Sequence, residues 1–379
     1  MNREYKQIIF LRLIYSIFKS FVLIFVNIYL WKTSKDIKSV AIFNSCNYIA
    51  AFLSFYIANR IALKNMKINY ILSSISFISL FIITAILKEN TYHYAPIIGF
   101  LGGCGDGMFF FNLNFFQANK LDKEAADKFI SILGMVNKAS SIITPLISGI
   151  VIEKYGFIYM IYTLVILLII QFINVMFIPS SKIHSLGKLN FKRLKNKDFL
   201  KITMTNGILT PYWEFGIISY SIFLFSFSNK EGLTGMLNSG FSLLAILFYY
   251  LYIRLTEKVE RKNLMFMGSL CLSIAMVFLI KPMFTGFLIY SFMIVIGDSF
   301  FSKPLVGIQL YITKKYSETM EDVFDNLILR VFFLTMGRVI FHALMYFFFT
   351  GYDSLIFKVL LFYNMLIPYV TYRLGESEV

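Results

Sequence analysis

Blocks of about 20 predominantly apolar residues follow one another along almost the whole of this 379-residue chain. A helix of that length crosses the hydrocarbon core of a bilayer, which is about 30 Å thick. Inside a bilayer the backbone must satisfy its own hydrogen bonds, so each block is expected to be a helix. Only 15% of the residues are charged, against about 25% in soluble domains. We therefore predict an all-α integral membrane protein and exclude soluble enzyme folds.

The apolar blocks predict twelve transmembrane helices in two sets of six. The first set covers residues 8–31, 39–58, 68–87, 95–116, 130–152 and 157–178, and the second covers 203–227, 232–254, 263–282, 286–312, 327–349 and 354–371. The predicted organisation is an N-terminal six-helix bundle (1–178), a basic cytoplasmic linker (179–200) and a C-terminal six-helix bundle (201–379).

The net charge of +15 is concentrated at the ends of the predicted helices. Of the 36 Lys and Arg residues, 22 lie at helix ends on the side of the N-terminus, 7 lie at the opposite ends, and 7 lie within the helices. Basic loops remain in the cytoplasm, so both termini are predicted to be cytoplasmic, in a multi-pass protein of a bacterial plasma membrane. The charge is thereby explained without nucleic acid binding.

The long linker holds six basic residues between Lys182 and Lys197. A solvated linker that fixes the topology is the favoured interpretation, and a site for lipid headgroups or a partner protein is the alternative. The three cysteines, Cys46, Cys104 and Cys271, lie in apolar blocks without metal-ligand spacing. We predict no metal and no cofactor.

The two halves of the sequence resemble each other at nearly constant offsets. Gly105-Asp106-Gly107 matches Gly297-Asp298-Ser299 at an offset of 192, whereas Asp127, Phe129 and Gly156 match Asp322, Phe324 and Gly351 at 195. Two parallel six-helix repeats with a substrate site near the midplane are an architecture of secondary transporters.

The loops after the second and eighth predicted helices carry related motifs. The first reads Phe55-x-x-x-Asn59-Arg60-x-Ala62-x-Lys64, and the second reads Ile253-x-x-x-Glu257-Lys258-x-Glu260-Arg261-Lys262. Both resemble degenerate copies of the G-x-x-x-D-R-x-G-R-R/K signature of the major facilitator superfamily. The resemblance implies twelve helices, transport by alternating access, and loop residues that stabilise one conformation.

Two further segments are similar to members of that superfamily. Thr144-Pro145-Leu-Ile-Ser148-Gly149 in the fifth predicted helix resembles the G-P-x-x-G-G motif of exporters, with Thr and Ser in place of two glycines. The run from Gly107 to Asn112 is similar to poorly characterised members from low-GC Gram-positive bacteria. The resemblance of Thr144–Gly149 to the exporter motif favours export.

Four ionisable residues stand near the middle of predicted helices one, four, seven and ten: Lys19, Asp106, Glu214 and Asp298. In the superfamily these helices line the central cavity. Charges inside a bilayer are costly and mark transport pathways. The acids are expected to bind a proton or a cationic group as access alternates, with Lys19 offsetting part of their charge. The alternative is a set of structural ion pairs.

Basic residues form a second candidate group. Lys138 and Arg338 lie within predicted helices five and eleven and are candidates for binding a substrate carboxylate or phosphate. Arg12, Lys303 and Arg330 are expected to extend toward the cytoplasmic interface. His342 lies four residues after Arg338 on the same helix face and is interpreted as a packed polar residue rather than a proton relay.

The predicted function is alternating-access transport of a small molecule, with protons driving export of a drug, peptide or metabolite. The protein is expected to act as a monomer and not as an enzyme. Three alternatives remain: a proton-coupled importer of the same fold, a lipid-modifying membrane enzyme, and a transport-inactive scaffold or sensor. The three histidines, His93, His184 and His342, provide no catalytic cluster for the enzyme.

Overall fold

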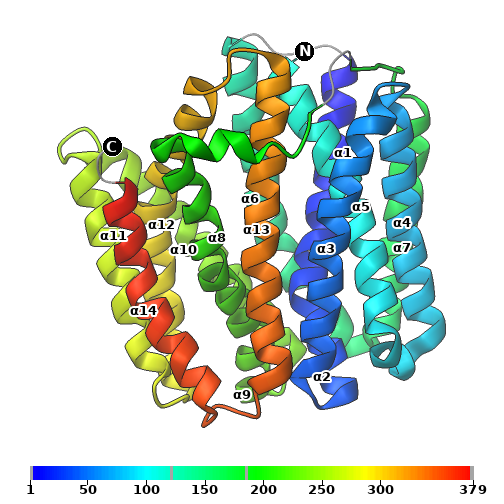
Figure 1. Ribbon diagram of the computed structural model, residues 1–379. Coiled ribbons are helices and arrows are strands. Elements are labelled where there is room, and N and C mark those ends of the chain that lie inside the picture. Colours follow the sequence, from blue (N-terminus) through cyan, green and yellow to red (C-terminus); the bar gives the residue numbers. More distant parts are fainter. Residues whose placement is uncertain (1–2, 120–122, 184–186, 376–379) are drawn as a thin grey trace. The chain divides into compact units, whose positions relative to one another are not determined.

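The computed structural model describes residues 3–119, 123–183 and 187–375, and every regular element in these ranges is a helix (Figure 1). Contacts divide the chain into two compact units. Unit 1 consists of Met1–Leu186 and Lys230–Ser239, and unit 2 consists of Gly187–Asn229 and Gly240–Val379. The side chains of Asp127, Phe129 and Lys303, which the sequence analysis singled out, lie outside the described residues.

Eleven helical stretches among the described residues are long and apolar enough to cross a membrane. One of them, Met66–Phe116, is 51 residues long and contains two helices, α4 (Met66–Leu87) and α5 (Ala95–Asn119), joined by the short helix η2 (Lys88–Tyr94). It therefore accounts for two predicted helices, and each of the twelve predicted segments overlaps one of the eleven stretches. The prediction of an all-α membrane protein is confirmed.

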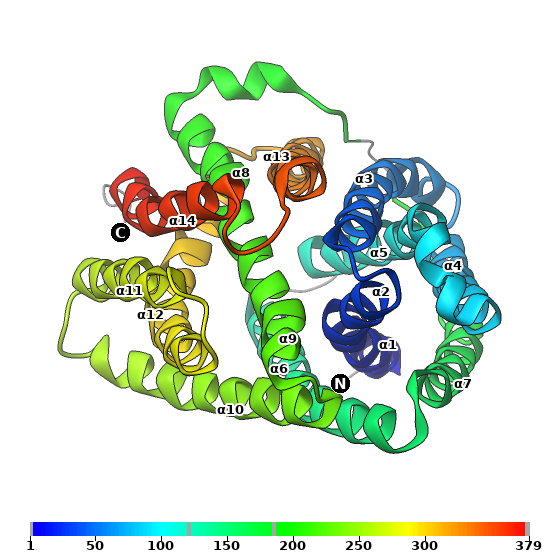
Figure 2. The same cartoon turned by 90° about the horizontal axis from the view of Figure 1, so that it is seen from below.

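Unit 1 is built around the first helix of the chain. Besides α4, η2 and α5, this unit contains α1 (Arg3–Phe21), η1 (Val22–Val26), α2 (Asn27–Ser34), α3 (Ile37–Ala62), α6 (Lys123–Tyr155) and α7 (Phe157–Met176). Helix α5 packs against α3 and α4, while α1 packs against α6 and α7. Seen from below, α1 and α2 lie inside the arc formed by α3, α5, α4 and α7 (Figure 2).

Unit 2 holds most of the second set of helices. They are η3 (Phe191–Lys195), α8 (Lys197–Ile218), η4 (Ser219–Phe223), α9 (Leu224–Ser228), α10 (Glu231–Leu255), α11 (Arg261–Ala275), η5 (Met276–Leu279), α12 (Phe284–Lys315), α13 (Met320–Phe348) and α14 (Leu355–Gly375). Helix α8 packs against α13 and α14, and α11 packs against α12 and α14. The first nine residues of α10, up to Ser239, belong to unit 1.

The internal repeat extends to irregularities of the backbone. The π-helix η1 follows α1, and the π-helix η4 follows α8, the corresponding helix of the second half. The next short helices, α2 and α9, both end at a left-handed residue, Lys35 with φ of 54° and Asn229 with φ of 50°. Gly156 and Gly351, matched by the repeat, have φ of 93° and 148°, where a side chain would be strained. These shared features support the predicted two-fold repeat.

Candidate transport site

The carboxylate of Asp106 on α5 is held by two side chains of α1. Lys19 Nζ lies 2.5 Å from Asp106 Oδ2, and the Tyr15 hydroxyl donates a hydrogen bond of 2.8 Å to Oδ1. The Asp106 side chain is only 8% exposed and that of Lys19 is 21% exposed. Two of the four predicted central residues therefore form one ion pair inside unit 1.

Glycines in α5 bring this helix close to its neighbours and fix the position of Asp106. A Cβ atom on Gly103 would lie 2.0 Å from the carbonyl oxygen of Asn47, and one on Gly107 would lie 2.2 Å from that of Ala51. Only glycine permits such an approach to the backbone of α3. The glycines near Asp106 therefore have a packing role.

Arg12 lies on α1, two turns before Lys19. Its Nε donates a 3.0 Å hydrogen bond to Asn137 Oδ1 on α6, and the hydroxyl of Ser16 donates to the same oxygen at 2.6 Å. Its guanidinium carbon is 5.0 Å from the ring centre of Tyr15 and 5.4 Å from that of Phe110. These contacts hold the side chain against α6 and α5 within unit 1, and the expectation that Arg12 extends toward the interface stays a prediction.

Glu214 on α8 is the most deeply enclosed of the candidate acids, with a side chain only 1% exposed. Arg338 Nε on α13 lies 3.1 Å from Oε1, and His342 Nε2 lies 3.0 Å from Oε2. The spacing of Arg338 and His342 places both on one face of α13, so both oxygens of one carboxylate are engaged. His342, interpreted from sequence as a packed polar residue, belongs to this cluster.

Asp298 on α12 has a different environment from the other acids. It accepts hydrogen bonds from the hydroxyls of Tyr249 on α10, at 3.3 Å, and Ser302, one turn further along α12. Lys138 on α6 is half-buried, and its carbonyl accepts a hydrogen bond from Ser141. The four central residues thus belong to three separate polar clusters.

The two motif loops lie at helix ends, as predicted. Asn59 is buried near the end of α3, and the exposed Arg60 stacks over the ring of Tyr56 at 5.5 Å. Phe55 and Ala62 of the first motif are buried, whereas the other charged residues of the two loops are exposed apart from the half-buried Lys262: Lys64, Glu257, Lys258, Glu260, Arg261 and Lys262. Their predicted role in stabilising one conformation stays a prediction.

The exporter-like segment of α6 packs against the first residues of α10. A Cβ on Gly235 would lie 2.1 Å from the carbonyl oxygen of Pro145, and one on Gly149 would lie 2.6 Å from that of Glu231. Glu153, one turn beyond Gly149, accepts a 2.8 Å hydrogen bond from the backbone N–H of Gly232. The substituted motif therefore retains a close helix contact within unit 1.

An open cavity of about 1080 Å³ lies beside this contact. Lys32 and Glu231, which form an ion pair of 2.8 Å, both line it, as do the stacked rings of Tyr29 and Phe157. Further charged and aromatic residues line the cavity: Lys88, Glu89, Glu153, Phe25 and Tyr92. This end of unit 1 is therefore polar and accessible.

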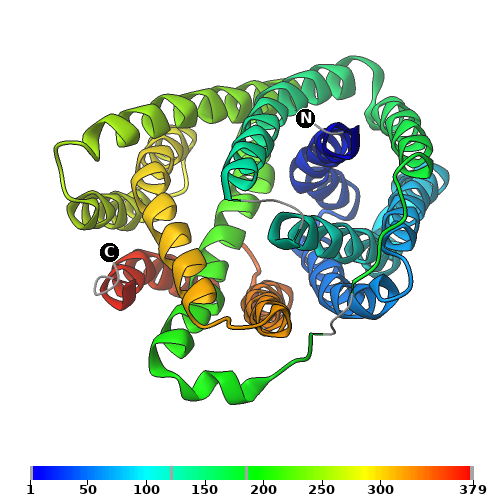
Figure 3. The ribbon, with the colours of Figure 1, turned by 90° about the horizontal axis from the view of Figure 1, so that it is seen from above.

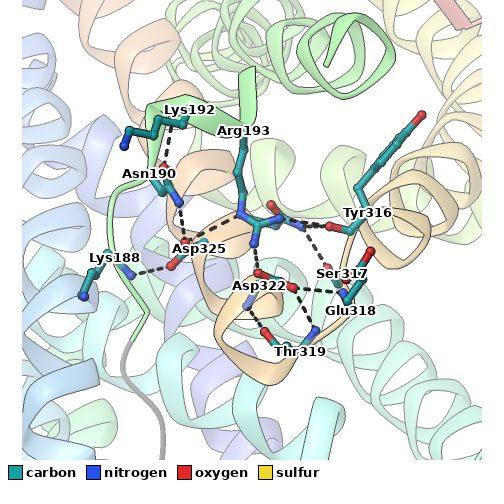
Figure 4. Close-up of polar contacts among 11 residues, drawn as sticks. Lys188, Asn190, Lys192, Arg193, Tyr316, Ser317, Glu318, Thr319, Asp322 and Asp325 are labelled. Carbon is teal, nitrogen blue, oxygen red and sulfur yellow. Dashed lines mark hydrogen bonds and ion pairs between the residues drawn. The ribbon is translucent and has the colours of Figure 1, made fainter. Parts of the chain in front are cut away.

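The linker is fastened to α13 by hydrogen bonds and ion pairs (Figure 4). Arg193 pairs with Asp322 and, at 3.6 Å, with Asp325, and it also donates to the carbonyl of Tyr316 at 3.1 Å. Asp325 accepts further hydrogen bonds from the backbone N–H of Lys188 at 2.6 Å and from Asn190 at 3.1 Å. The segment curves past α13 before it enters α8 (Figure 3).

Sequence reasoning found the interior charges but missed their neutral partners. Tyr15 and Asn137 carry no charge, and nothing in the sequence connects Asn137 on α6 with Arg12 on α1. The spacing of Arg338 and His342 was the one usable signal, because it placed them on a common face. Their shared contact, Glu214, is more than 120 residues away in the sequence.

The sequence profile of the Major Facilitator Superfamily matches residues 8–321. Because this match covers most of the chain, the protein belongs to the major facilitator superfamily. It is a multi-pass membrane transporter and not an enzyme.

Among proteins of similar sequence is YqgE of Bacillus subtilis (strain 168), described as uncharacterized. It is 25% identical over 328 residues, which cover 83% of this chain and 76% of YqgE. The nucleoside transporter NupG has a similar structure, with a TM-score of 0.70 at 15% identity over 99% of each chain. The D-xylose-proton symporter has a TM-score of 0.74 at 10% identity over 97% of this chain and 96% of that one. At these identities the solved structures show a shared fold.

Proposed function

We propose that this transporter exports a small molecule across a bacterial plasma membrane in exchange for protons. Membership of the superfamily supplies the transport function. The observation that carries proton coupling is the Glu214 cluster, in which a carboxylate 1% exposed is contacted by Arg338 and His342. The proposed orientation, with both termini in the cytoplasm, follows the distribution of basic residues.

Glu214 carries the coupling proton in this proposal. The ionised carboxylate is stabilised by charge-assisted contacts with Arg338 and His342. Protonation removes its negative charge and weakens both contacts, so the preferred arrangement of α8 and α13 changes with proton binding. Asp106 and Lys19 form a second pair with the same chemistry, and Asp298 lies among hydroxyl groups that support either protonation state.

The direction of transport is inferred from α6. Its Thr144-Pro145 segment resembles the exporter motif, and the packing of Pro145 and Gly149 against Gly235 and Glu231 resembles the close helix contact that such a motif permits. The proposed functional form is a monomer. A proton-coupled importer of the same fold is the alternative direction.

The direct test uses everted membrane vesicles with an acidic interior, to which candidate amphipathic cations, organic anions and short peptides are added. An exporter exchanges added substrate for internal protons, so the pH gradient recorded by a fluorescent dye collapses. Glu214→Gln is expected to abolish this response, and Asp106→Asn and Asp298→Asn to reduce it. Asp353→Asn, which changes an exposed acid in a loop, serves as the matched control.

Other outcomes identify the alternatives. An importer would release protons only when substrate is loaded inside the vesicles. A scaffold or sensor would give no flux with any member of the panel, and the acid variants would behave like the wild type. Either result contradicts proton-driven export.

A further inference from the structure

We propose that the transported molecule carries an anionic group and that Arg12 binds this group. The inference rests on the proposed transport function but not on the direction of transport or on its coupling to protons. From the sequence, the three central acids favoured a cationic or zwitterionic substrate, and the basic residues on predicted helices five and eleven left an anionic one open; the inference takes the second of these.

The contacts of the acids are the first reason. Asp106 is engaged by Lys19 and Tyr15, and Glu214 is engaged by Arg338 and His342. Each of these carboxylates already has a basic partner within its own unit. A cationic substrate would have to compete with that partner for the carboxylate.

The geometry of Arg12 is the second reason. Asn137 holds Nε, while the rings of Tyr15 and Phe110 flank the guanidinium group at 5.0 and 5.4 Å. Its NH1 nitrogen is enclosed by protein and has no acceptor among the described residues. Buried donors normally have acceptors, and each exception calls for an explanation.

A guanidinium group fixed in this way suits a planar or tetrahedral oxyanion. Its donors form a fork that matches a carboxylate or phosphate through paired hydrogen bonds. Tyr15 is buried and supports the guanidinium group, whereas the half-buried ring of Phe110 can provide an apolar contact for the rest of the ligand. The chemical class is therefore an organic anion with an aromatic or apolar body.

Arg330 on α13 repeats part of this pattern in unit 2. Its Nε is also enclosed and lacks an acceptor among the described residues. It precedes Arg338 by about two turns on the same helix. The expectation from sequence that it extends to the interface does not explain this enclosed donor. Arg12 is nevertheless the primary contact, because Asn137 already fixes its orientation.

The test measures binding of four ring-matched probes to the full-length protein in nanodiscs of zwitterionic lipid. Benzoate and phenyl phosphate present the two anionic groups, benzamide is neutral, and benzylammonium is cationic. Isothermal titration is expected to show saturable binding of at least one anionic probe, at least tenfold tighter than binding of benzamide or benzylammonium. The relative affinity of benzoate and phenyl phosphate identifies the anionic group.

Arg12→Gln is expected to weaken binding of the anionic probe at least tenfold, and Arg12→Lys, which keeps the charge but not the fork, to weaken it less. The matched control is Arg254→Gln on α10, since Arg254 also lies over a tyrosine ring, 4.9 Å from that of Tyr250, but is exposed. It is expected to bind like the wild type. Unchanged melting temperature of Arg12→Lys verifies that the comparison is between folded proteins.

The proposal is overturned if benzylammonium binds as tightly as the anions, if Arg12→Gln binds like Arg254→Gln, or if neither anion binds saturably. These outcomes are distinct from failure of proton-driven export. Arginine-dependent anion binding without a pH response in vesicles would overturn export by proton exchange and support this inference. A pH response to cations alone would support export by proton exchange and overturn this inference.

Discussion

The ion pair between Lys19 and Asp106 shows how two charges are accommodated in an apolar helix bundle. Inserting either one alone costs about 2.5–3.5 kcal/mol. At 2.5 Å the two charges offset each other, and the Tyr15 hydroxyl occupies the other carboxylate oxygen. Removing either charge therefore leaves the other without its ionic partner in an apolar environment.

This pair predicts non-additive effects of mutation. Lys19→Gln and Asp106→Asn should each lower stability by about 3–5 kcal/mol, because each leaves one buried charge unpaired. The double variant should be less destabilised than the sum, because no unpaired charge remains. Thermal unfolding of the purified variants measures this coupling. Additive losses would mean that the two residues contribute independently.

The sequence identified the charged residues in the interior but not the clusters they form. Four central charges at repeat-equivalent positions suggested one common group. The structure instead pairs Lys19 with Asp106 and joins Glu214 to Arg338 and His342, leaving Asp298 with two hydroxyls. Pairing depends on helix rotation and side-chain reach, which hydropathy does not encode.

The contact between α6 and the beginning of α10 depends on three glycines. Gly149, Gly232 and Gly235 lie where an added Cβ would meet backbone or carboxylate oxygen at 2.1–2.6 Å. At Gly149 and Gly235 the nearest atom is backbone, so a methyl group would require movement of a helix, whereas at Gly232 the side chain of Glu153 would have to move. The sequence motif on α6 indicated one side of this contact, and the glycines on α10 had no recognised motif.

Alanine substitutions in α10 should therefore have opposite effects at two positions. Gly235→Ala should destabilise the protein by about 1–3 kcal/mol through overpacking against Pro145. Gly240→Ala, five residues later, meets no atom within 4 Å. It should stabilise the helix by up to about 1 kcal/mol, since alanine is the better helix former. Melting temperatures measure both, and equal effects would show that the glycine contact has no packing role.

The linker illustrates what composition alone misses. Its lysines at 188, 192, 195 and 197 are exposed, as a solvated linker requires. Arg193 is instead enclosed by ion pairs with Asp322 and Asp325, residues about 130 positions later. Counting basic residues predicts the side of the membrane but cannot distinguish the one that anchors the segment.

The overall architecture was predictable because a bilayer permits few structures. Apolar length fixed the helices, and the sequence repeat indicated two related halves. The assignment of Lys230–Ser239 to unit 1 was not predictable, since these residues begin a helix whose remainder lies in unit 2. That assignment depends on the contacts of Gly232 and Gly235 with α6.

The predicted orientation of the whole chain can be tested by cysteine labelling. In a background with Cys46, Cys104 and Cys271 replaced by serine, Asp353→Cys should react with a membrane-impermeant maleimide in intact cells. Lys192→Cys should react only after the membrane is permeabilised, because the linker is predicted to be cytoplasmic. The reverse pattern would invert the topology and with it the proposed direction of export.

The paired π-helices η1 and η4 have a mechanical consequence. A π-helical turn interrupts the regular hydrogen-bond ladder, so the helix is more easily bent there. Each lies just beyond a central charge, Lys19 before η1 and Glu214 before η4. The distal segments α2 and α9 can therefore bend at these turns while the Lys19–Asp106 pair and the Glu214 cluster keep their contacts.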